Sequence, residues 1–316
     1  MAVDEEGPVG RRCAKALGLT LVELYAIVVT APKRYKSYEI PKRSGGFRTI
    51  SQPSRELKSI QYFLINDVLS KLPVHPSAMA YREGSSIAKN ALRHVSSRVI
   101  LKLDFENFFG SIRVADWRRY ALGRLPHWSE MDFGFSAQVM FWGCGGRSPI
   151  CLSIGAPVSP ILSNAIMYDF DVQMSRFAAE ADLVYTRYAD DLTISSNDFL
   201  DANAIIKQVQ AALARSDAPR LSLNEAKTYL ASKARSRRVT GLVLSNEGAV
   251  SLGRDRKRLI SAMVHRAGLG QLSAKELMTL HGLLAFAHDV EPDFVVRLER
   301  KYGGEAIAAL FHRHDD

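Results

Sequence analysis

The stretch YTRYADDLTISS, residues 185–196, constrains the fold more than any other part of the sequence. It places two carboxylates, Asp190 and Asp191, side by side between two short runs rich in β-branched and aromatic residues. Such runs favour strands and Asp disfavours them, so the pattern predicts a tight hairpin with both acids at its turn. A solvated polar turn is the ordinary explanation for an isolated pair of acids. Here Leu192 and Ile194 belong to strands that pack, which predicts a rigidly held turn.

A third carboxylate, Asp104, ends another predicted strand within RVILKLDFENFF, residues 98–109. Residues alternate between two faces along this strand, with Lys102 and Asp104 on the same face. If this strand neighbours the hairpin in one sheet, three carboxylates converge at its edge. Like charges raise each other's pKa, and two Mg²⁺ ions would compensate them, since hard oxygen ligands suit Mg²⁺. Such ions serve in-line phosphoryl displacement in polymerases and in nucleases, and the acids alone do not choose between these classes.

The composition is that of a basic protein with a sizeable core. The 316 residues include 42 basic and 33 acidic ones, a net charge of +9, and 47% are hydrophobic. This balance favours a polyanionic partner and one to three domains. The three cysteines, Cys13, Cys144 and Cys151, lack metal-ligand spacing and are interpreted as small hydrophobic residues. The N-terminal region carries no apolar leader, so a cytoplasmic protein is expected.

Helices and hairpins are predicted in mixed order along the rest of the chain. A hairpin with a Gly45-Gly46 turn is expected over residues 35–53, and a strand over 240–245. Helices are predicted over about 11–30, 54–72 with Ser54 as N-cap, 85–95, 113–143, from 159 with Ser159 as N-cap and Pro160 in the first position, 200–216, and from 254 onward. This order indicates an α+β fold rather than βαβ repeats.

At this point the residues resemble a known family. YADD (188–191), the Asp-x-x-x-Phe-Phe strand end (104–109) and GAPVSP (155–160) together look like a reverse transcriptase. NALRH (90–94) matches an NAxxH motif and VTG (239–241) a downstream VTG motif, both similar to bacterial retron reverse transcriptases. The resemblance covers nearly the whole chain, and five motifs in the right order are specific.

The resemblance implies a right-hand polymerase architecture with fingers, an antiparallel palm sheet and a helical thumb. It implies N-terminal helices and fingers in residues 1–98, and a palm in 99–235 with a helical insertion at about 113–150. The end of the palm, a connection and the thumb would occupy 236–316.

By the same resemblance, Asp104, Asp190 and Asp191 are the catalytic and metal-binding acids. Asp104 and Asp190 would bridge two Mg²⁺ ions, with help from the Phe105 carbonyl, and Mn²⁺ would substitute for Mg²⁺. Lys227, in LSLNEAKT, resembles the lysine near the leaving pyrophosphate and would act as general acid. An exposed lysine at a helix start is the alternative.

The resemblance also assigns a nucleotide-binding set. Two fingers cations would grip the triphosphate, an aromatic ring would exclude the ribose 2′-OH, and a Gly-x-Pro turn would approach the nucleotide or template. The residues are Lys42 and Arg48, Phe109, and Gly155, Ala156 and Pro157. Ile154 departs from the family pattern, because many relatives carry Gln immediately before this turn.

Further residues are interpreted as RNA-binding positions or family markers. They are Asn90, Ala91, His94, Val239, Thr240, Gly241, Arg254, Arg256, Lys257 and Arg258, and the last four form a basic cluster with Arg235, Arg237 and Arg238. A basic cluster in a polymerase would contact phosphates, although most charge runs are solvated faces. For His94, an RNA contact and a structural hydrogen bond remain equal alternatives.

The implied function is an RNA-directed DNA polymerase that uses dNTPs to copy a cognate structured noncoding RNA. A guanosine 2′-OH would prime synthesis and give a branched RNA–DNA molecule, with a role in antiphage defence and a separate effector protein. Two alternatives stay open. One is another bacterial defence polymerase, template-independent or protein-primed; the other is an RNA-binding scaffold that sequesters a toxic effector. No membrane partner is expected.

Overall fold

The computed structural model describes residues 8–42, 45–215 and 219–311. Helices and short sheets follow one another in mixed order, which confirms the predicted α+β class. The chain divides into two compact units: Met1–Gly84, Leu101–Ile194 and Asp201–Tyr229 form the first, and Ser85–Ile100, Ser195–Leu200 and Leu230–Asp316 the second. The division into fingers, palm and thumb stays a prediction, and residues 1–7, 43–44, 216 and 312–316, on which predictions fall, lie outside the described ranges.

The elements up to the first half of the chain are α1 (Val9–Leu17), α2 (Leu21–Val28), η1 (Ala31–Lys33), β1 (Tyr35–Pro41), β2 (Phe47–Pro53), α3 (Arg55–Asp67), η2 (Leu69–Lys71), α4 (Ile87–Leu92), β3 (Val99–Asp104), α5 (Phe108–Ser111), α6 (Val114–Arg124) and α7 (Glu130–Met140). Most of them fall within the ranges predicted from apolar spacing.

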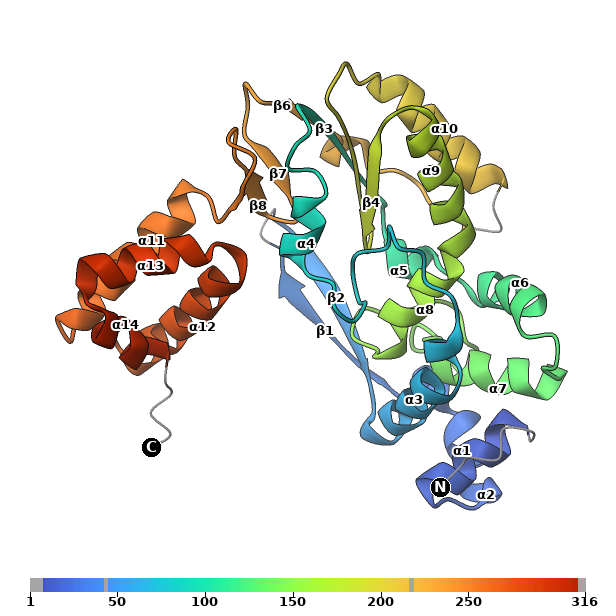
Figure 1. The fold of residues 1–316 in the computed structure, drawn as a ribbon. Helices are drawn as coiled ribbons and strands as arrows, with labels where there is room; N and C mark the ends of the chain where they lie inside the picture. The colour runs from blue at the N-terminus through green and yellow to red at the C-terminus, as the bar shows by residue number, and fades with distance from the viewer. Residues whose placement is uncertain (1–7, 43–44, 216–218, 312–316) are drawn as a thin grey trace. The chain divides into compact units, whose positions relative to one another are not determined.

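The remaining elements are α8 (Val158–Ile166), α9 (Tyr168–Glu180), β4 (Val184–Tyr188), β5 (Asp191–Ser196), α10 (Ala202–Arg215), η3 (Glu225–Lys227), β6 (Tyr229–Ser232), β7 (Arg237–Val239), β8 (Leu242–Leu244), β9 (Val250–Ser251), α11 (Arg254–Gly268), α12 (Ala274–Val290), α13 (Pro292–Tyr302) and α14 (Gly304–Phe311). Figure 1 shows their course through the chain.

The central sheet brings the predicted strands together. Its strand order is β4-β5-β3-β6, so the hairpin β4–β5 lies beside the strand that ends at Asp104, which is the condition on which the convergence of the three acids depended. The backbone N–H of Phe105 donates to the carbonyl of Asp190 at 3.0 Å, and that of Asn224 donates to the carbonyl of Asp104 at 2.8 Å. These bonds fix the end of β3 against the hairpin turn on one side and against the segment before η3 on the other.

Helix α9 supports the hairpin from one face of this sheet. It runs beside β4 and packs against α8 and α10 (Figure 1). Its Phe170 and Met174 are fully buried, and so are Leu192 and Ile194 of β5. Burial of such side chains stabilises the fold by about 1.5–3 kcal/mol each. The apolar flanks therefore hold the turn, as the sequence predicted.

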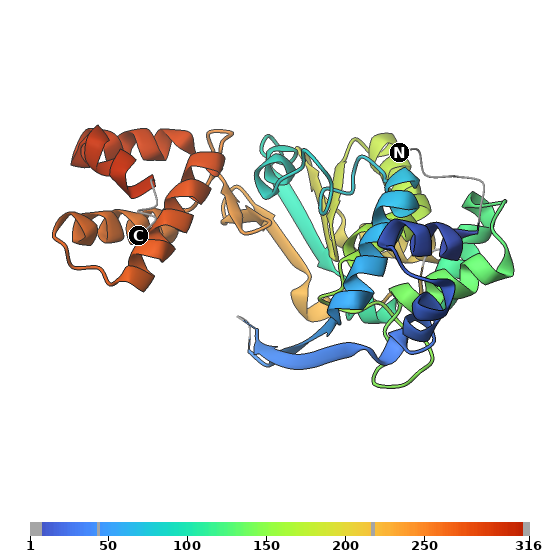
Figure 2. The same cartoon turned by 90° about the horizontal axis from the view of Figure 1, so that it is seen from below.

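The hairpin β1–β2 is confirmed as predicted. It is antiparallel, with Ile40 opposite Arg48, and is drawn as a long two-stranded ribbon in Figure 2. Gly45 and Gly46 both adopt positive φ, at 87° and 75°, which other residues adopt only under strain. After β2, the side chain of Ser54 accepts the backbone N–H of Leu57 and caps α3, again as predicted.

The start of α8 corrects one prediction. The helix begins at Val158, and Pro157 already has helical backbone angles, so Ser159 lies inside the helix and does not cap it. The buried Ser159 Oγ has no hydrogen-bond partner among the described residues. The expected single helix is also two helices, α8 and α9, which meet at Met167.

The second unit has its own core. Helix α4 packs on the small sheet β7-β8-β9, and α11 to α14 pack against one another. Arg237 on β7 is 1% exposed and donates to the carbonyls of Ser97 and Ser245. The prediction that Arg237 belongs to a phosphate-facing basic cluster is therefore wrong, since its guanidinium ties the unit together from inside. Across the described ranges, every helix is too short or too polar to cross a membrane.

Candidate active site

The three predicted acids lie together at one end of the central sheet. Asp104 is the last residue of β3 and is 7% exposed. Asp190 occupies the turn between β4 and β5, and Asp191 opens β5; both are half-buried. Ala189, which precedes them, has a φ of +58°. The hairpin thus turns through a left-handed residue, an uncommon conformation for a residue with a side chain.

The raised pKa values of two of these acids show that the cluster lacks neighbouring positive charge. Burial and then the charge of Asp104 raise the pKa of Asp190. Burial also raises the pKa of Asp191 to about 6; Lys102 opposes the shift, while a hydrogen bond with Asp104 and the nearby carboxylates add to it. Carboxylates that resist ionisation in this way favour any cation placed beside them.

Two lysines supply part of that charge. The Nζ of Lys227 lies 2.6 Å from Oδ1 of Asp104, and the Nζ of Lys102 lies 3.6 Å from Oδ2 of Asp191. Burial lowers the pKa of Lys227, but its hydrogen bond to Asp104 and the charges of the carboxylates outweigh this and raise it. The structure thus brings Lys227 into the site, whereas the sequence interpretation omitted Lys102. Lys102 could have been found from its position, two residues before Asp104 on the same face of the strand.

The donor chemistry of the cluster fits a hard divalent cation. It offers carboxylate oxygens, and the raised pKa values of Asp190 and Asp191 show that added positive charge would be favoured. As the side chains stand, no group of three His, Cys, Asp or Glu residues in the described ranges could hold a metal ion. The number and identity of the ions therefore stay predictions, as does the Phe105 carbonyl as a ligand.

The residues predicted to hold the triphosphate lie on the tip of the β1–β2 hairpin. Lys42 and Arg48 are both exposed. The positive charge of Arg48 lowers the pKa of Asp190, which places Arg48 within electrostatic reach of the acids. Tyr81, absent from the sequence interpretation, is a further neighbour, because its own pKa is raised by burial and then by Asp190. Binding of a triphosphate by Lys42 and Arg48 remains a prediction.

The two aromatic residues after Asp104 differ in environment. Phe108 is 4% exposed and its ring stacks on Phe105 at 6.0 Å. Phe109 is only half-buried and contacts the edge or face of Phe108, with centroids 5.3 Å apart. The core position is thus filled by Phe108, which leaves Phe109 available for the predicted gate.

The Gly155-Ala156-Pro157 turn approaches a strand of the chain itself. Gly155 has a φ of +113°, and a Cβ there would meet the side chain of Ile50 at 3.0 Å. The backbone N–H of Ser51 donates to the carbonyl of Ile154 at 2.8 Å. The close approach predicted from this glycine is therefore made to β2, and a contact with nucleotide or template stays a prediction. Ile154 contributes its carbonyl to this junction.

The NALRH segment lies in the interior of the second unit. His94 is fully buried, and its Nδ1 lies 2.7 Å from Oγ of Ser195. Burial, with a smaller effect from Arg93, lowers the pKa of His94 to about 3, so the ring is neutral. Asn90 and Ala91 are also fully buried, and the amide of Asn90 has no hydrogen-bond partner among the described residues. A direct contact of these side chains with RNA remains a prediction.

The VTG segment forms the turn between β7 and β8. Val239 is buried, Thr240 has a φ of +47°, and Gly241 has a φ of +80°. The Thr240 hydroxyl donates to the carbonyl of Ile87 at 3.1 Å, which ties the turn to the first residue of α4. Ala91 of the NALRH motif and Val239 of the VTG motif also belong to one buried apolar cluster, so the two motifs share the core of the second unit although they lie far apart in the sequence.

The basic residues at the start of α11 divide into two kinds. Arg254 and Arg258 are exposed and, with Lys257 and Ser261, line a shallow hollow of about 380 Å³. Lys257 is paired with Glu291, with 3.0 Å between Nζ and Oε1. Arg256 lies over the ring of Phe286 at 5.1 Å. Only the exposed pair is fully available for a polyanion, and its binding role stays a prediction.

Comparison with known proteins identifies the class of protein to which this site belongs. The family model described as reverse transcriptase (RNA-dependent DNA polymerase) matches residues 40–244. This match contains Asp104, Asp190, Asp191 and Lys227, so the acids lie in the part of the chain that defines the class.

Sequence similarity to curated relatives identifies the branch of this class. The retron Ec83 reverse transcriptase of Escherichia coli is 38% identical over 278 residues, covering 87% of this chain and 89% of the relative. The retron Ec73 enzyme of the same organism is 32% identical, with the same coverage of both chains. The chain belongs to the reverse transcriptase family, within its bacterial retron branch. The predicted resemblance, right-hand fold class and RNA-directed DNA polymerase activity are thereby confirmed.

Among solved structures, a telomerase from Candida albicans in complex with a fragment of telomeric RNA aligns with 92% of this chain and 62% of that chain. The TM-score is 0.48 and the identity 11%. A similarity of this size carries no argument, and the class rests on the sequence relationships.

Proposed function

We propose that this polymerase copies a structured noncoding RNA encoded beside it and starts from a guanosine 2′-OH of that RNA. The product would be a branched RNA–DNA molecule. The observation that carries this proposal is the similarity to retron reverse transcriptases over most of both chains. The NALRH and VTG segments, which share one buried cluster in the second unit, support the same branch.

The chemistry would be centred on the three acids. Mg²⁺ held by Asp104, Asp190 and Asp191 would activate the primer hydroxyl and stabilise the charge that develops on the leaving pyrophosphate. Lys227, whose ammonium already lies in the cluster, would give its proton to the pyrophosphate. Its raised pKa keeps it protonated at neutral pH, as a general acid requires.

The remaining residues would bind and select the nucleotide. Lys42 and Arg48 would grip the triphosphate from the tip of the β1–β2 hairpin, where exposed cations can fold over a substrate. The half-buried ring of Phe109 would occupy the space that a ribose 2′-OH needs. The chain would thus select dNTPs by shape and bind them by charge.

The second unit would supply part of the RNA contact. The buried amide of Asn90 has no partner in the described chain, and leaving such a group unsatisfied costs about 1–3 kcal/mol. Because Asn90 is fully buried, a bound water rather than RNA would supply the missing hydrogen bond. Exposed Arg254 and Arg258 would contact phosphates, which makes binding weaker at high salt.

The test is to purify the protein from its bacterial host with its bound nucleic acid. We expect a molecule that is sensitive to both RNase and DNase and that a debranching enzyme separates into RNA and DNA. An unbranched single-stranded DNA would indicate a template-independent or protein-primed polymerase. RNA without DNA would indicate a scaffold. Either outcome would contradict the proposal.

The biological role proposed with this product is antiphage defence with a separate effector protein. Phage should form fewer plaques on cells that carry the complete locus than on cells in which Asp190 is changed to Asn. Affinity purification of the polymerase should recover the same effector with and without phage. Equal plaque numbers in both strains would contradict the defence role without touching the polymerase assignment.

A further inference from the structure

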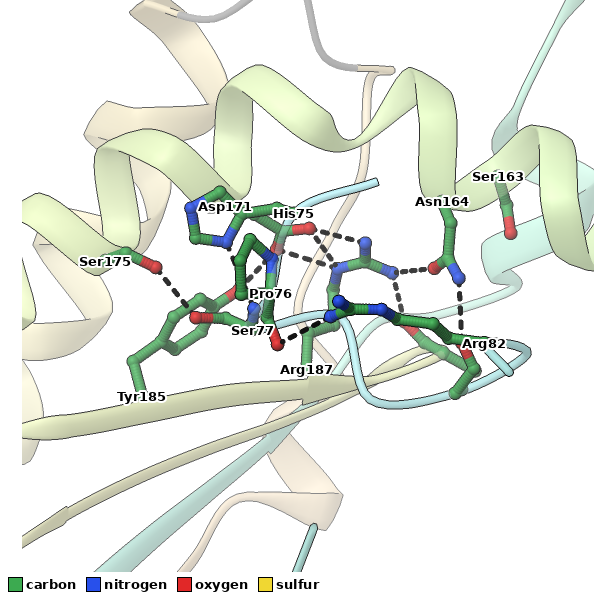
Figure 3. Close-up of polar contacts among 12 residues, drawn as sticks. His75, Pro76, Ser77, Arg82, Ser163, Asn164, Asp171, Ser175, Tyr185 and Arg187 are labelled. Atoms are coloured by element: carbon green, nitrogen blue, oxygen red, sulfur yellow. Dashed lines mark hydrogen bonds and ion pairs between the residues drawn. The ribbon is translucent and has the colours of Figure 1, made fainter. Parts of the chain in front are cut away.

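The centre of the first unit contains a buried charge network directly beneath the catalytic turn. Arg187, on β4, has a side chain that is 0% exposed, as does Asp171 on α9 (Figure 3). The guanidinium donates from Nε to Oδ1 of Asp171 at 2.9 Å and from Nη2 to Oδ2 at 2.6 Å. This is the bidentate geometry that makes an Arg–carboxylate pair both strong and directional.

The third nitrogen of this guanidinium reaches the catalytic turn. Nη1 of Arg187 donates to the carbonyl of Ala189 at 3.1 Å. Ala189 is the left-handed residue of the turn, and the next residue is Asp190. A carbonyl held in this way fixes the peptide plane that leads into Asp190. The position of the carboxylate is therefore linked to α9 through one side chain.

The same nitrogen also reaches a second segment beside the acids. Nη1 of Arg187 donates to Oδ1 of Asn164 on α8 at 3.1 Å, and Nδ2 of Asn164 donates to the carbonyl of Ala80 at 2.8 Å (Figure 3). Backbone bonds strengthen the link, because Arg187 N–H donates to the Ser77 carbonyl and its own carbonyl accepts from Met79 N–H. The residue after Ala80 is Tyr81, the neighbour of Asp190 described above.

Stability alone does not account for this network. A buried ion pair loses so much hydration that an apolar pair of similar volume is often equally stable or more so. Lysine would retain the charge but would lack the planar fork that reaches Asp171, Asn164 and Ala189 together. What the arginine adds is a fixed geometry between α8, α9, the turn and the 77–82 segment.

We propose that Arg187 is a positioning residue for the polymerase reaction, and that Asp171 and Asn164 act through it to hold the Ala189–Asp190 peptide and the Tyr81 segment in register. The network raises the rate of the chemical step and contributes little to substrate affinity. Misplacement of a reacting group by about 1 Å costs about 10²-fold in rate. This inference rests on the assignment of Asp190 to catalysis, which the Asp190→Asn variant tests separately.

The decisive variant replaces both charges with apolar side chains, Arg187→Met together with Asp171→Met. It removes the links to Ala189 and Asn164 and leaves no buried unpaired charge, although the Tyr185 hydroxyl loses its acceptor, Oδ1 of Asp171. The matched control is Ser175→Ala, which removes the bond of 2.9 Å between Ser175 of α9 and Ser77, without touching Arg187. For each variant we would measure Tm, the Kd for a primer–template RNA, and kcat and KM for a dNTP.

We expect the double variant to stay folded with a Tm lowered by several degrees, because the buried Tyr185 hydroxyl loses its acceptor. Its KM and Kd should stay within about threefold of wild type, while kcat falls about 10–100-fold. The control should keep all four values. A double variant with unchanged kcat would overturn the proposal, and so would an equal loss of kcat in Ser175→Ala.

A second variant decides the matter if the double variant does not fold. Arg187→Lys retains the charge opposite Asp171 but lacks the planar guanidinium that reaches Asn164 and Ala189 as well. Measured per folded molecule, its kcat should fall at least tenfold with KM unchanged. A wild-type kcat in Arg187→Lys would overturn the proposal, because the charge alone would then suffice.

Discussion

Two clusters of charge adjoin the same hairpin, and they are built in opposite ways. One joins Arg187 of β4 to Asp171 of α9, and the other lies at Asp190 and Asp191 in the turn. In the first, Arg187 and Asp171 are completely buried, and Tyr185 adds a hydrogen bond of 2.7 Å from its hydroxyl to Oδ1 of Asp171. In the second, Asp190 and Asp191 stand half-buried with raised pKa values, and the positive charges of Lys227, Arg48 and Lys102 offset only part of the shift. The charges of the first cluster are compensated by each other, whereas the carboxylates of the second lack enough neighbouring positive charge.

The difference separates structure from chemistry. A satisfied buried pair holds neighbouring elements in one geometry, because moving either partner exposes an uncompensated charge. An unsatisfied cluster gains free energy when it meets a cation, and perturbed pKa values of this kind concentrate at functional sites. We call the Arg187–Asp171 pair the rigid base and the Asp190–Asp191 turn the reactive tip, the second name following from the catalytic role proposed above. The first two variants below change one cluster each.

The largest effect is expected from Asp190→Asn. Removing one carboxylate from the reactive tip should lower dNTP incorporation by at least about 10³-fold, while RNA binding survives. Primer extension and filter binding on the same preparation measure the two quantities. Asp169→Asn, on the half-buried Asp169 of α9 that pairs with Arg124, is the control and should extend primers normally. Extension that persists in Asp190→Asn would show that the acids have been assigned wrongly.

The next effect concerns the rigid base. Asp171→Asn leaves the Arg187 guanidinium buried without its counter-charge, which should lower the free energy of unfolding by about 3–5 kcal/mol. Urea unfolding followed by circular dichroism measures this change. Glu180→Gln, in the exposed pair of Glu180 with Arg176 on the same helix, should leave it nearly unchanged. Equal losses in both variants would contradict the special role of the buried pair.

His94 extends the comparison to a buried group that stays neutral. Its pKa of about 3 lies below the usual 6.5, so the unfolded chain binds a proton between these values while the folded chain does not. Stability from this group is complete above pH 6.5 and falls by about 1.4 kcal/mol per pH unit below it. Unfolding of wild type and His94→Gln from pH 8 to pH 4.5 measures the difference. The same pH slope in both proteins would contradict this account.

The smallest effect on the reaction is expected from a change at Phe109, and its neighbour Phe108 provides the contrast. Phe109→Ala should relax selection against rNTPs about tenfold, since the half-buried ring would no longer fill the space of a 2′-OH. Phe108→Ala should instead lower stability by about 3–5 kcal/mol, because this ring is buried. Competition between dATP and ATP, with Tm as a second reading, checks both. Unchanged rNTP exclusion in Phe109→Ala would remove Phe109 from the gate.

The reactive tip was predictable from the sequence, and the rigid base was not. Asp190 and Asp191 stand out because acids between two apolar strands contradict local propensity, and Asp104 because it ends an alternating strand. Arg187 lies in the same quoted stretch, yet its partners Asp171 and Asn164 come from helices whose placement no local pattern gives. Periodicity reports which residues form an element, but it does not report which elements meet.

Tertiary burial also explains the predictions that were wrong. Arg237 was grouped with exposed cations because its neighbours in sequence are basic, but on β7 its side chain turns into the core. Ser159 looked like a helix cap because it precedes Pro160, but the helix already begins at Val158. In both cases a residue-type preference gave way to packing that the sequence alone does not reveal.

One measurement tests the contrast most directly: the free energy of unfolding of Asp190→Asn and of Asp171→Asn, side by side at pH 8 with a metal chelator. The pKa of Asp190 is raised by folding, so its ionised form destabilises the fold at this pH, and Asp190→Asn should make the protein more stable. Asp171→Asn should make it less stable. Opposite signs would show that one acid belongs to a reactive tip and the other to a rigid base. If both variants destabilise the protein alike, the distinction between the two clusters is wrong.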